Sequence, residues 1–235
     1  MDIHIGKYGY YLDQILRLKY QVKYKIQKGL WLPLNSEMFI GIYEQYDDFL
    51  PDKNTTVLDI GSQYGDYAII CNKKYHADVI AFEPLLNNCY KIKKYANINK
   101  AVITIYPFAI GTPDRFANIP VKNNMIGYNF SNTISIRKDM LNAQTVHFVP
   151  LDYFNFKNVD LVKIDVEGFE MEVLHSGIEL LKKFKPKIII ETHSAGLYKQ
   201  VKEFLEELGY SFVHENDVRT VNNRQIANMY FKVVK

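Results

Sequence analysis

The stretch Val57-Leu58-Asp59-Ile60-Gly61-Ser62-Gln63-Tyr64-Gly65-Asp66 decides the fold, because an apolar strand runs here into a tight glycine turn and then into a helix. A turn of this kind brings backbone N–H groups and a helix start up to a ligand. A dinucleotide-binding turn needs glycine at the position of Gln63 for close approach to a pyrophosphate. The stretch therefore disfavours nicotinamide cofactors, and a purely structural turn is the alternative interpretation.

After this turn, short β-branched runs alternate with amphipathic segments. We expect strands over residues 57–60, 78–82, 103–110, 161–166 and 187–191. Strands that alternate with helices indicate a parallel sheet wound by right-handed crossovers. Asparagine and glycine interrupt the alternation over residues 115–149, which predicts an inserted hairpin or loop. Residues 210–214 and 226–234 predict an antiparallel hairpin at the sheet edge. The fold class is therefore α/β, doubly wound and mostly parallel.

Before the sheet, apolar residues over 8–50 fall at helical spacings, so we expect a helical extension over residues 1–52 and one domain over residues 53–235. The 235 residues are 48% hydrophobic and 23% charged, which is typical of a globular chain, and a net charge of +3 demands no polyanionic partner. Charged residues interrupt residues 1–20, so we expect neither a signal peptide nor a membrane span, and a cytoplasmic location is the default.

The second strand ends in Glu83-Pro84, about twenty residues beyond the glycine turn, where a carboxylate can accept both ribose hydroxyls of a cofactor. The alternative is that Glu83 caps the helix that follows. The carboxylate of Asp59 suits a ligand with a positive amino group and no phosphate. Together these features favour S-adenosyl-L-methionine as the cofactor.

The strand over residues 161–166 carries Lys163 and Asp165 on one face, away from its apolar side chains. Such charges are costly inside a strand unless they are paired, so the choice lies between a structural ion pair and an active site at the carboxyl end of the sheet. The next strand ends in Glu191 and His193. If the two strands are neighbours, Asp165, Glu191 and His193 form a divalent metal site for Mg²⁺ or Mn²⁺, a general-base cluster, or a solvated strand end.

Several of these segments together resemble the FkbM-type S-adenosylmethionine-dependent methyltransferases. The resemblance covers about residues 55–193, and its most specific part is Lys163-Ile164-Asp165-Val166-Glu167-Gly168-Phe169-Glu170. It implies a class I methyltransferase (Rossmann-like) fold and O-methyl transfer to a sugar or a natural-product hydroxyl. It also implies that Phe108, Ala109 and Ile110 lie beside the adenine. One departure is that Ser62-Gln63 replaces the Ala-Asn usual in the family.

We therefore expect an O-methyltransferase that acts on a hydroxyl of a small-molecule or glycan acceptor. Asp165 and His193 are the candidates for activating that hydroxyl, with Lys163 and Glu191 orienting them. The candidate cofactor-binding residues are Asp59, Gly61, Ser62, Gln63, Tyr64, Gly65, Glu83, Pro84, Phe108, Ala109 and Ile110. One alternative is an RNA ribose 2′-O-methyltransferase, because residues 91–94 and 182–187 are basic. The other is a cofactor-binding interaction subunit that has lost catalysis.

Overall fold

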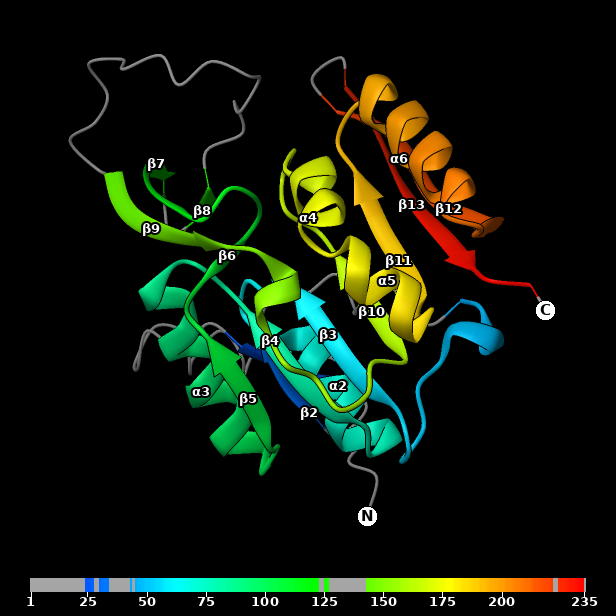
Figure 1. Cartoon of the computed structure of the whole chain (residues 1–235). Coiled ribbons are helices and arrows are strands. Elements are labelled where there is room, and N and C mark those ends of the chain that lie inside the picture. Colours follow the sequence, from blue (N-terminus) through cyan, green and yellow to red (C-terminus); the bar gives the residue numbers. More distant parts are fainter. Residues whose placement is uncertain are drawn as a thin grey trace.

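A seven-stranded sheet forms the centre of the part of the chain that the computed structural model describes, which is residues 24–27, 30–33, 43, 45–122, 125–126, 143–221 and 224–234 (Figure 1). The strand order is β12-β13-β11-β10-β3-β4-β5. The strands are β3 (Thr56–Ile60), β4 (Asp78–Phe82), β5 (Ile103–Tyr106), β10 (Leu161–Ile164), β11 (Lys187–Thr192), β12 (Ser211–Val221) and β13 (Arg224–Lys232).

The first five of these strands pair in parallel, so their carboxyl ends meet at one edge of the sheet. Strand β10 lies between β3 and β11, and Lys163 stands opposite Asp59 in the register. The two strands that end before Asp165 and His193 are therefore neighbours, which was the condition for the expected cluster. At the other side of β11, β13 and β12 pair antiparallel, as expected, although both strands run further into the polar stretch between them than the sequence suggested.

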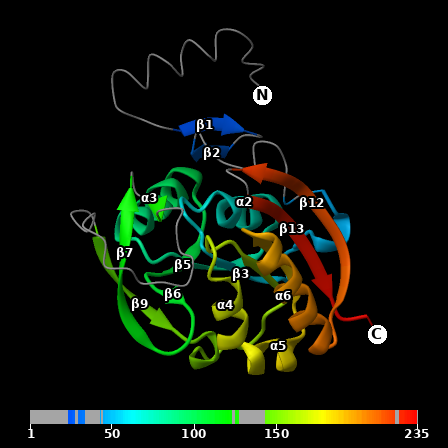
Figure 2. The ribbon, with the colours of Figure 1, turned by 90° about the horizontal axis from the view of Figure 1, so that it is seen from above.

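Helices cover both faces of the sheet, which confirms the doubly wound prediction (Figure 2). On one face lie α2 (Asp66–Tyr75) and α3 (Leu86–Asn99), and on the other lie α4 (Glu170–Ser176), α5 (Ile178–Phe184) and α6 (Ala195–Glu207). Alternating side chains of the strands separate into two apolar clusters, so Leu58 and Ile60 pack on the α4–α6 side while Val57 packs on the α2 side. None of the helices in the described residues is long and apolar enough to cross a membrane.

A second, smaller sheet has the order β6-β9-β7-β8, and the expected insertion over residues 115–149 supplies all of its strands except β6. Its strands are β6 (Ala109–Ile110), β7 (Arg115–Lys122), β8 (Met125–Ile126) and β9 (Ala143–Val149), and β7 pairs antiparallel with β9 as an inserted hairpin would. The single strand expected over residues 103–110 is wrong, because β5 ends at Tyr106 and β6 pairs with β9 instead. Pro107 follows β5 and has no N–H group to continue the ladder.

The helical prediction for the amino-terminal extension is wrong where the structure describes it. Strands β1 (Tyr24–Gln27) and β2 (Leu30–Pro33) form an antiparallel pair, and a short 3-10 helix, η3 (Asp47–Phe49), lies near the end of the stretch over 8–50 that was expected to be helical. Apolar and polar residues alternate in β1, and two residues including a glycine separate it from β2, which favours a tight hairpin. The rest of that helical prediction lies outside the described residues, and the division at residue 52 stays a prediction.

Candidate functional site

The glycine turn brings the end of β3 against the end of β10. Gly61 and Gly65 have φ angles of +82° and +78°, and Gln63 has a φ of +49°. A Cβ atom on Gly61 would lie 1.8 Å from the backbone oxygen of Asp165. Only glycine allows this approach, so residue 61 sets the distance between the turn and the strand end that carries Asp165.

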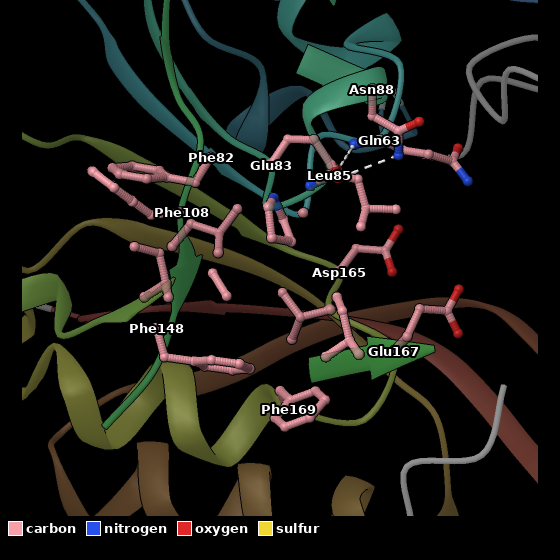
Figure 3. Close-up of a pocket in the computed structure, with 17 residues that line it drawn as sticks. Gln63, Phe82, Glu83, Leu85, Asn88, Phe108, Phe148, Asp165, Glu167 and Phe169 are labelled. Atoms are coloured by element: carbon pink, nitrogen blue, oxygen red, sulfur yellow. Dashed lines mark hydrogen bonds between the residues drawn. The ribbon is translucent and has the colours of Figure 1, made fainter. Parts of the chain in front are cut away.

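A pocket opens at the carboxyl ends of β3, β4 and β10, with the insertion as one wall (Figure 3). Phe82 and Phe108 lie at one end of it, and Asp165 and Glu167 lie at the other. Its lining residues are Ile60, Gly61, Gln63, Phe82, Glu83, Pro84, Leu85, Asn88, Phe108, Ala109, Ile110, Ile119, Phe148, Asp165, Val166, Glu167 and Phe169. The predicted cofactor-binding residues Gly61, Gln63, Glu83, Pro84, Phe108, Ala109 and Ile110 thus meet around one cavity.

Glu83 is a buried carboxylate in the wall of this pocket. It is 4% exposed, and its Oε2 accepts a hydrogen bond of 2.8 Å from the backbone N–H of Gln63. Its Oε1 accepts bonds from the N–H of Leu85 at 2.9 Å and from Nδ2 of Asn88 at 3.2 Å. Burial raises the pKa of Glu83 to about 7, although these three bonds act to lower it. Glu83 therefore contacts the start of α3, as the capping alternative supposed, and also faces the cavity.

Four other predicted cofactor-binding residues do not line the pocket. Asp59 is fully buried beneath the turn, and the hydroxyl group of Ser62 donates a hydrogen bond of 2.7 Å to the backbone oxygen of Asp59. The ring of Tyr64 makes a cation–π contact with the ammonium group of Lys91, which lies 4.1 Å from the ring centroid. A Cβ on Gly65 would lie 2.8 Å from the side chain of Ile92, so this glycine lets α2 approach α3. These residues shape the turn. Asp59 lies 3.5 Å from Lys163 Nζ and does not line the pocket, so its expected contact with a ligand amino group stays a prediction.

The ammonium group of Lys163 contacts both the glycine turn and the strand end that carries Asp165. Lys163 is 4% exposed, and its Nζ lies 3.3 Å from the backbone oxygen of Gly61, 3.4 Å from Oδ2 of Asp165 and 3.5 Å from Oδ1 of Asp59. Burial raises the pKa of Asp59, and the charge of Lys163 opposes that rise. The Lys163–Asp165 ion pair therefore exists, and Asp165 also lines the pocket, so its place in an active site stays a prediction.

His193 lies behind the pocket among four carboxylates. Its Nδ1 is 2.7 Å from Oε1 of Glu170, and its Nε2 is 3.4 Å from Glu167 and 3.8 Å from both Asp165 and Glu191. Burial by itself lowers the pKa of His193, but the hydrogen bond to Glu170 and the charges of Asp165, Glu170 and Glu167 raise it to about 10. The raised pKa favours the protonated imidazole, which has no lone pair to accept a proton, so it argues against His193 as the general base. The role of His193 in catalysis stays a prediction.

The structure also changes the set of residues that could bind a metal ion. The atoms of Asp165, Glu167 and His193 that would ligate a metal lie within 4.8 Å of one another, so Glu167 takes the place expected for Glu191. Glu191 is 3% exposed, its Oε1 lies 3.8 Å from Nε2 of His193, and it is not among the residues that line the cavity. Glu191 thus belongs to the charge cluster around the imidazole.

The stability of the protein is expected to fall from about pH 7 to about pH 10. The folded-state pKa of His193 is raised above the value of 6.5, so its ion pairs stabilise the fold fully below about pH 6.5 and are lost as the pH rises through about 10. A pKa that is higher by one in the folded state than in the unfolded state adds about 1.4 kcal/mol to the unfolding free energy, so the loss should be several kcal/mol. Urea unfolding of the wild-type protein and of His193→Gln across this range measures it. Equal slopes for the two proteins would contradict the assignment.

Sequence reasoning missed several residues of the pocket. Asn88 and Leu85 follow Glu83 within the first helical turn, and that proximity was the available signal. Glu167 has a φ of +54°, a left-handed conformation that is uncommon for a residue other than glycine and is concentrated at functional sites. Ile119 and Phe148 come from the insertion, and nothing in their local sequence indicates that they reach the cavity.

A family model and a curated relative that match this chain are both methyltransferases. The methyltransferase FkbM domain matches residues 59–212. The hexuronic acid methyltransferase AglP of Haloferax volcanii is 27% identical over 156 residues, which are 66% of this chain. The chain spans 63% of the length of that curated relative.

Solved structures show the same fold. The methyltransferase FkbM from Methylobacillus flagellatus aligns with a TM-score of 0.51 at 16% identity, covering 76% of this chain and 44% of that one. A putative transferase from Pyrococcus horikoshii aligns with a TM-score of 0.54 at 12% identity, covering 98% of this chain and 85% of that one. At these identities the likeness shows the class I methyltransferase fold alone. With the domain match across more than half of its length, the chain belongs to the FkbM methyltransferase domain family.

Proposed function

We propose that the protein is an S-adenosylmethionine-dependent O-methyltransferase that acts on a hydroxyl of a sugar, a glycan or a small-molecule acceptor. The observation that carries this proposal is the buried carboxylate of Glu83 beside the glycine turn, in a pocket with an aromatic end and an acidic end. The family match and the hexuronic acid methyltransferase among the relatives support it.

The chemical groups of the cofactor match the side chains of the cavity from its aromatic end to its acidic end. The aromatic end, with Phe82 and Phe108, suits an adenine ring, because flat apolar side chains stack on it. The carboxyl group of Glu83 supplies an acceptor for ribose hydroxyls, which is strongest when the group is ionised. The carboxylate of Glu167, at the acidic end, suits the positively charged end of the molecule. Bound there, S-adenosylmethionine supplies an activated methyl group for in-line transfer.

The residues of this chain then align and deprotonate the acceptor. In this proposal Asp165 accepts a hydrogen bond from the acceptor hydroxyl and takes its proton as the methyl group is transferred. Lys163 holds the Asp165 carboxylate from beneath, across 3.4 Å. The protonated imidazole of His193 balances the charge of Asp165 and Glu167 and keeps these carboxylates in place. A divalent cation at Asp165, Glu167 and His193 is the alternative to the imidazolium, and loss of activity in chelator, restored by Mg²⁺ or Mn²⁺, would indicate it.

A sugar acceptor is favoured over RNA. The basic segment over residues 91–94 lies on α3, whereas the segment over 182–187 lies at α5 on the opposite face of the sheet (Figure 2). The two segments therefore form no continuous surface for a phosphate backbone. Methyl transfer from a labelled donor to hexuronic-acid saccharides, neutral saccharides and RNA oligonucleotides separates these acceptors. Transfer to RNA alone would overturn the sugar proposal, and tight cofactor binding with no transfer to any acceptor class would favour the non-catalytic subunit.

Changing Glu83 to glutamine tests the cofactor assignment directly. The neutral amide is expected to weaken S-adenosylhomocysteine binding by about 1.5–3 kcal/mol, the usual contribution of a hydrogen bond to a charged group. Because the pKa of Glu83 is raised to about 7, wild-type affinity should fall as the pH drops through that value, and Glu83→Gln should lose this dependence. Isothermal titration calorimetry measures both effects.

The matched control is Glu179→Gln, which removes an exposed carboxylate from α5 far from the pocket and should bind as the wild type does. A protein that is thermally stabilised by NAD but not by S-adenosylhomocysteine would refute the assignment.

A further inference from the structure

The ammonium group of Lys163 lies among three oxygens beneath the pocket, and none of them holds it closely. Its Nζ lies 3.3 Å from the backbone oxygen of Gly61, 3.4 Å from Oδ2 of Asp165 and 3.5 Å from Oδ1 of Asp59. Hydrogen bonds from N–H groups to oxygen commonly span about 2.7–3.2 Å, so all three distances are long. The position of the ammonium group, and with it the support of the Asp165 carboxylate, therefore depends on what else surrounds Lys163.

An aromatic ring from the amino-terminal extension covers the same ammonium group. Nζ of Lys163 lies over the ring of Tyr43, 5.4 Å from its centroid, which is within the range of a cation–π interaction. Tyr43 is 4% exposed and packs in the apolar cluster on the α2 side of the sheet. Leu161 belongs to that cluster, and alternation along β10 places Lys163 on the same face as Leu161. The ring and the ammonium group therefore meet where water has little access, and such contacts are stronger there than at the surface.

Contacts with neighbouring elements fix the segment that carries Tyr43. The ring of Tyr67, on α2, meets the ring of Tyr43 edge-on, with centroids 5.3 Å apart and an interplanar angle of 66°. Further along the chain, Tyr46 stacks on His214 of β12 with ring centroids 3.9 Å apart. The hydroxyl group of Tyr46 also donates a hydrogen bond of 2.8 Å to the backbone oxygen of Glu215. The segment is therefore attached to the antiparallel edge of the sheet and to α2, and Tyr43 lies between these attachments and Lys163.

We propose that Tyr43 is a positioning residue for methyl transfer, whose ring holds the ammonium group of Lys163 against the carboxylate of Asp165. This inference rests on the proposed function, in which Asp165 takes the proton of the acceptor hydroxyl. Without the ring, the ammonium group can move toward Asp59, which lies at a similar distance, and Asp165 then loses its support in the orientation that transfer requires. The FkbM domain match covers residues 59–212, so Tyr43 lies outside it.

The test replaces Tyr43 by phenylalanine and by difluorinated and trifluorinated phenylalanine. Fluorine withdraws negative charge from the face of the ring and adds little volume, so it weakens the attraction to a cation and preserves the packing. Relative to Tyr43→Phe, the single-turnover rate of methyl transfer is expected to fall stepwise, by about tenfold for the trifluorinated ring. Affinity for S-adenosylhomocysteine should stay constant across the series, because Tyr43 does not line the pocket.

A second measurement needs neither cofactor nor acceptor. In protein labelled with ¹³C at the lysine Cε atoms, the ring current of Tyr43 should shift the Hε signals of Lys163 upfield, and Tyr43→Leu should abolish this shift. Phe212→Leu is the matched control, because it removes a ring whose centroid lies 4.8 Å from Nζ of Lys202, between β12 and α6. This variant should keep the wild-type transfer rate and the wild-type Lys163 signals.

Equal transfer rates across the fluorinated series would overturn the inference, because the ring of Tyr43 would then act by packing alone. So would Lys163 signals that do not change in Tyr43→Leu, since the ring and the ammonium group would not be in contact in solution. If the wild-type protein transfers no methyl group from S-adenosylmethionine to any acceptor class, the proposed function fails instead, and the NMR shift separately decides whether the contact exists.

Discussion

Gly61→Ala is expected to unfold the protein or to remove most of its stability, a loss of about 4 kcal/mol or more out of the roughly 5–15 kcal/mol typical of a domain. The added Cβ would lie 1.8 Å from the backbone oxygen of Asp165 and 2.8 Å from its carbonyl carbon. Neither atom belongs to a flexible side chain, so β3 and β10 would have to separate at the edge of the sheet. The φ of +82° adds a conformational cost for any residue with a Cβ.

The measurement is urea unfolding, with Gly209→Ala as the control. Gly209 has a similar φ of +87°, but a Cβ there would meet nothing within 4 Å. The control should therefore lose only about 1–2 kcal/mol, the cost of the left-handed backbone. Similar losses in the two variants would show that the contact between Gly61 and Asp165 relaxes easily, contrary to this expectation.

Asp165→Asn is expected to lower turnover by about a hundredfold or more while leaving S-adenosylhomocysteine affinity within a few-fold, the pattern of a lost acid–base group. Asparagine has the same shape and keeps an acceptor oxygen for Lys163, but it cannot take the proton of the acceptor hydroxyl. Methyl transfer under single-turnover conditions measures the chemical step, and calorimetry measures binding.

Asp160→Asn serves as the matched control. Asp160 precedes the same strand, at the opposite end of the sheet, where its Oδ2 accepts bonds from Thr56 and Asn158. Turnover should be close to that of the wild type in this variant. If Asp165→Asn keeps full turnover, proton removal belongs to another group, and Glu167 is the next carboxylate to change because it also lines the cavity.

The sheet and part of the site could be predicted because they depend on neighbours in the chain. Alternation along β3 and β10 is visible in the sequence, and parallel pairing then places Glu83 and Asp165 at one edge. The amino-terminal strands were missed because a few apolar residues satisfy a helical and an alternating pattern equally well. No local pattern distinguishes the two until the partner strand is known.

The sequence by itself determined the succession of strands and turns along the chain, and therefore the edge of the sheet at which the charged strand ends lie. The tertiary structure alone decided which of those charges face a cavity. Asp59 points to Lys163 beneath the turn, His193 lies among carboxylates that include Glu170 and Glu191, and Asn88 donates a hydrogen bond to Glu83. The physical reason is that burial and charge act through space, so the pKa and the hydrogen-bonding capacity of a side chain depend on groups far away in the chain.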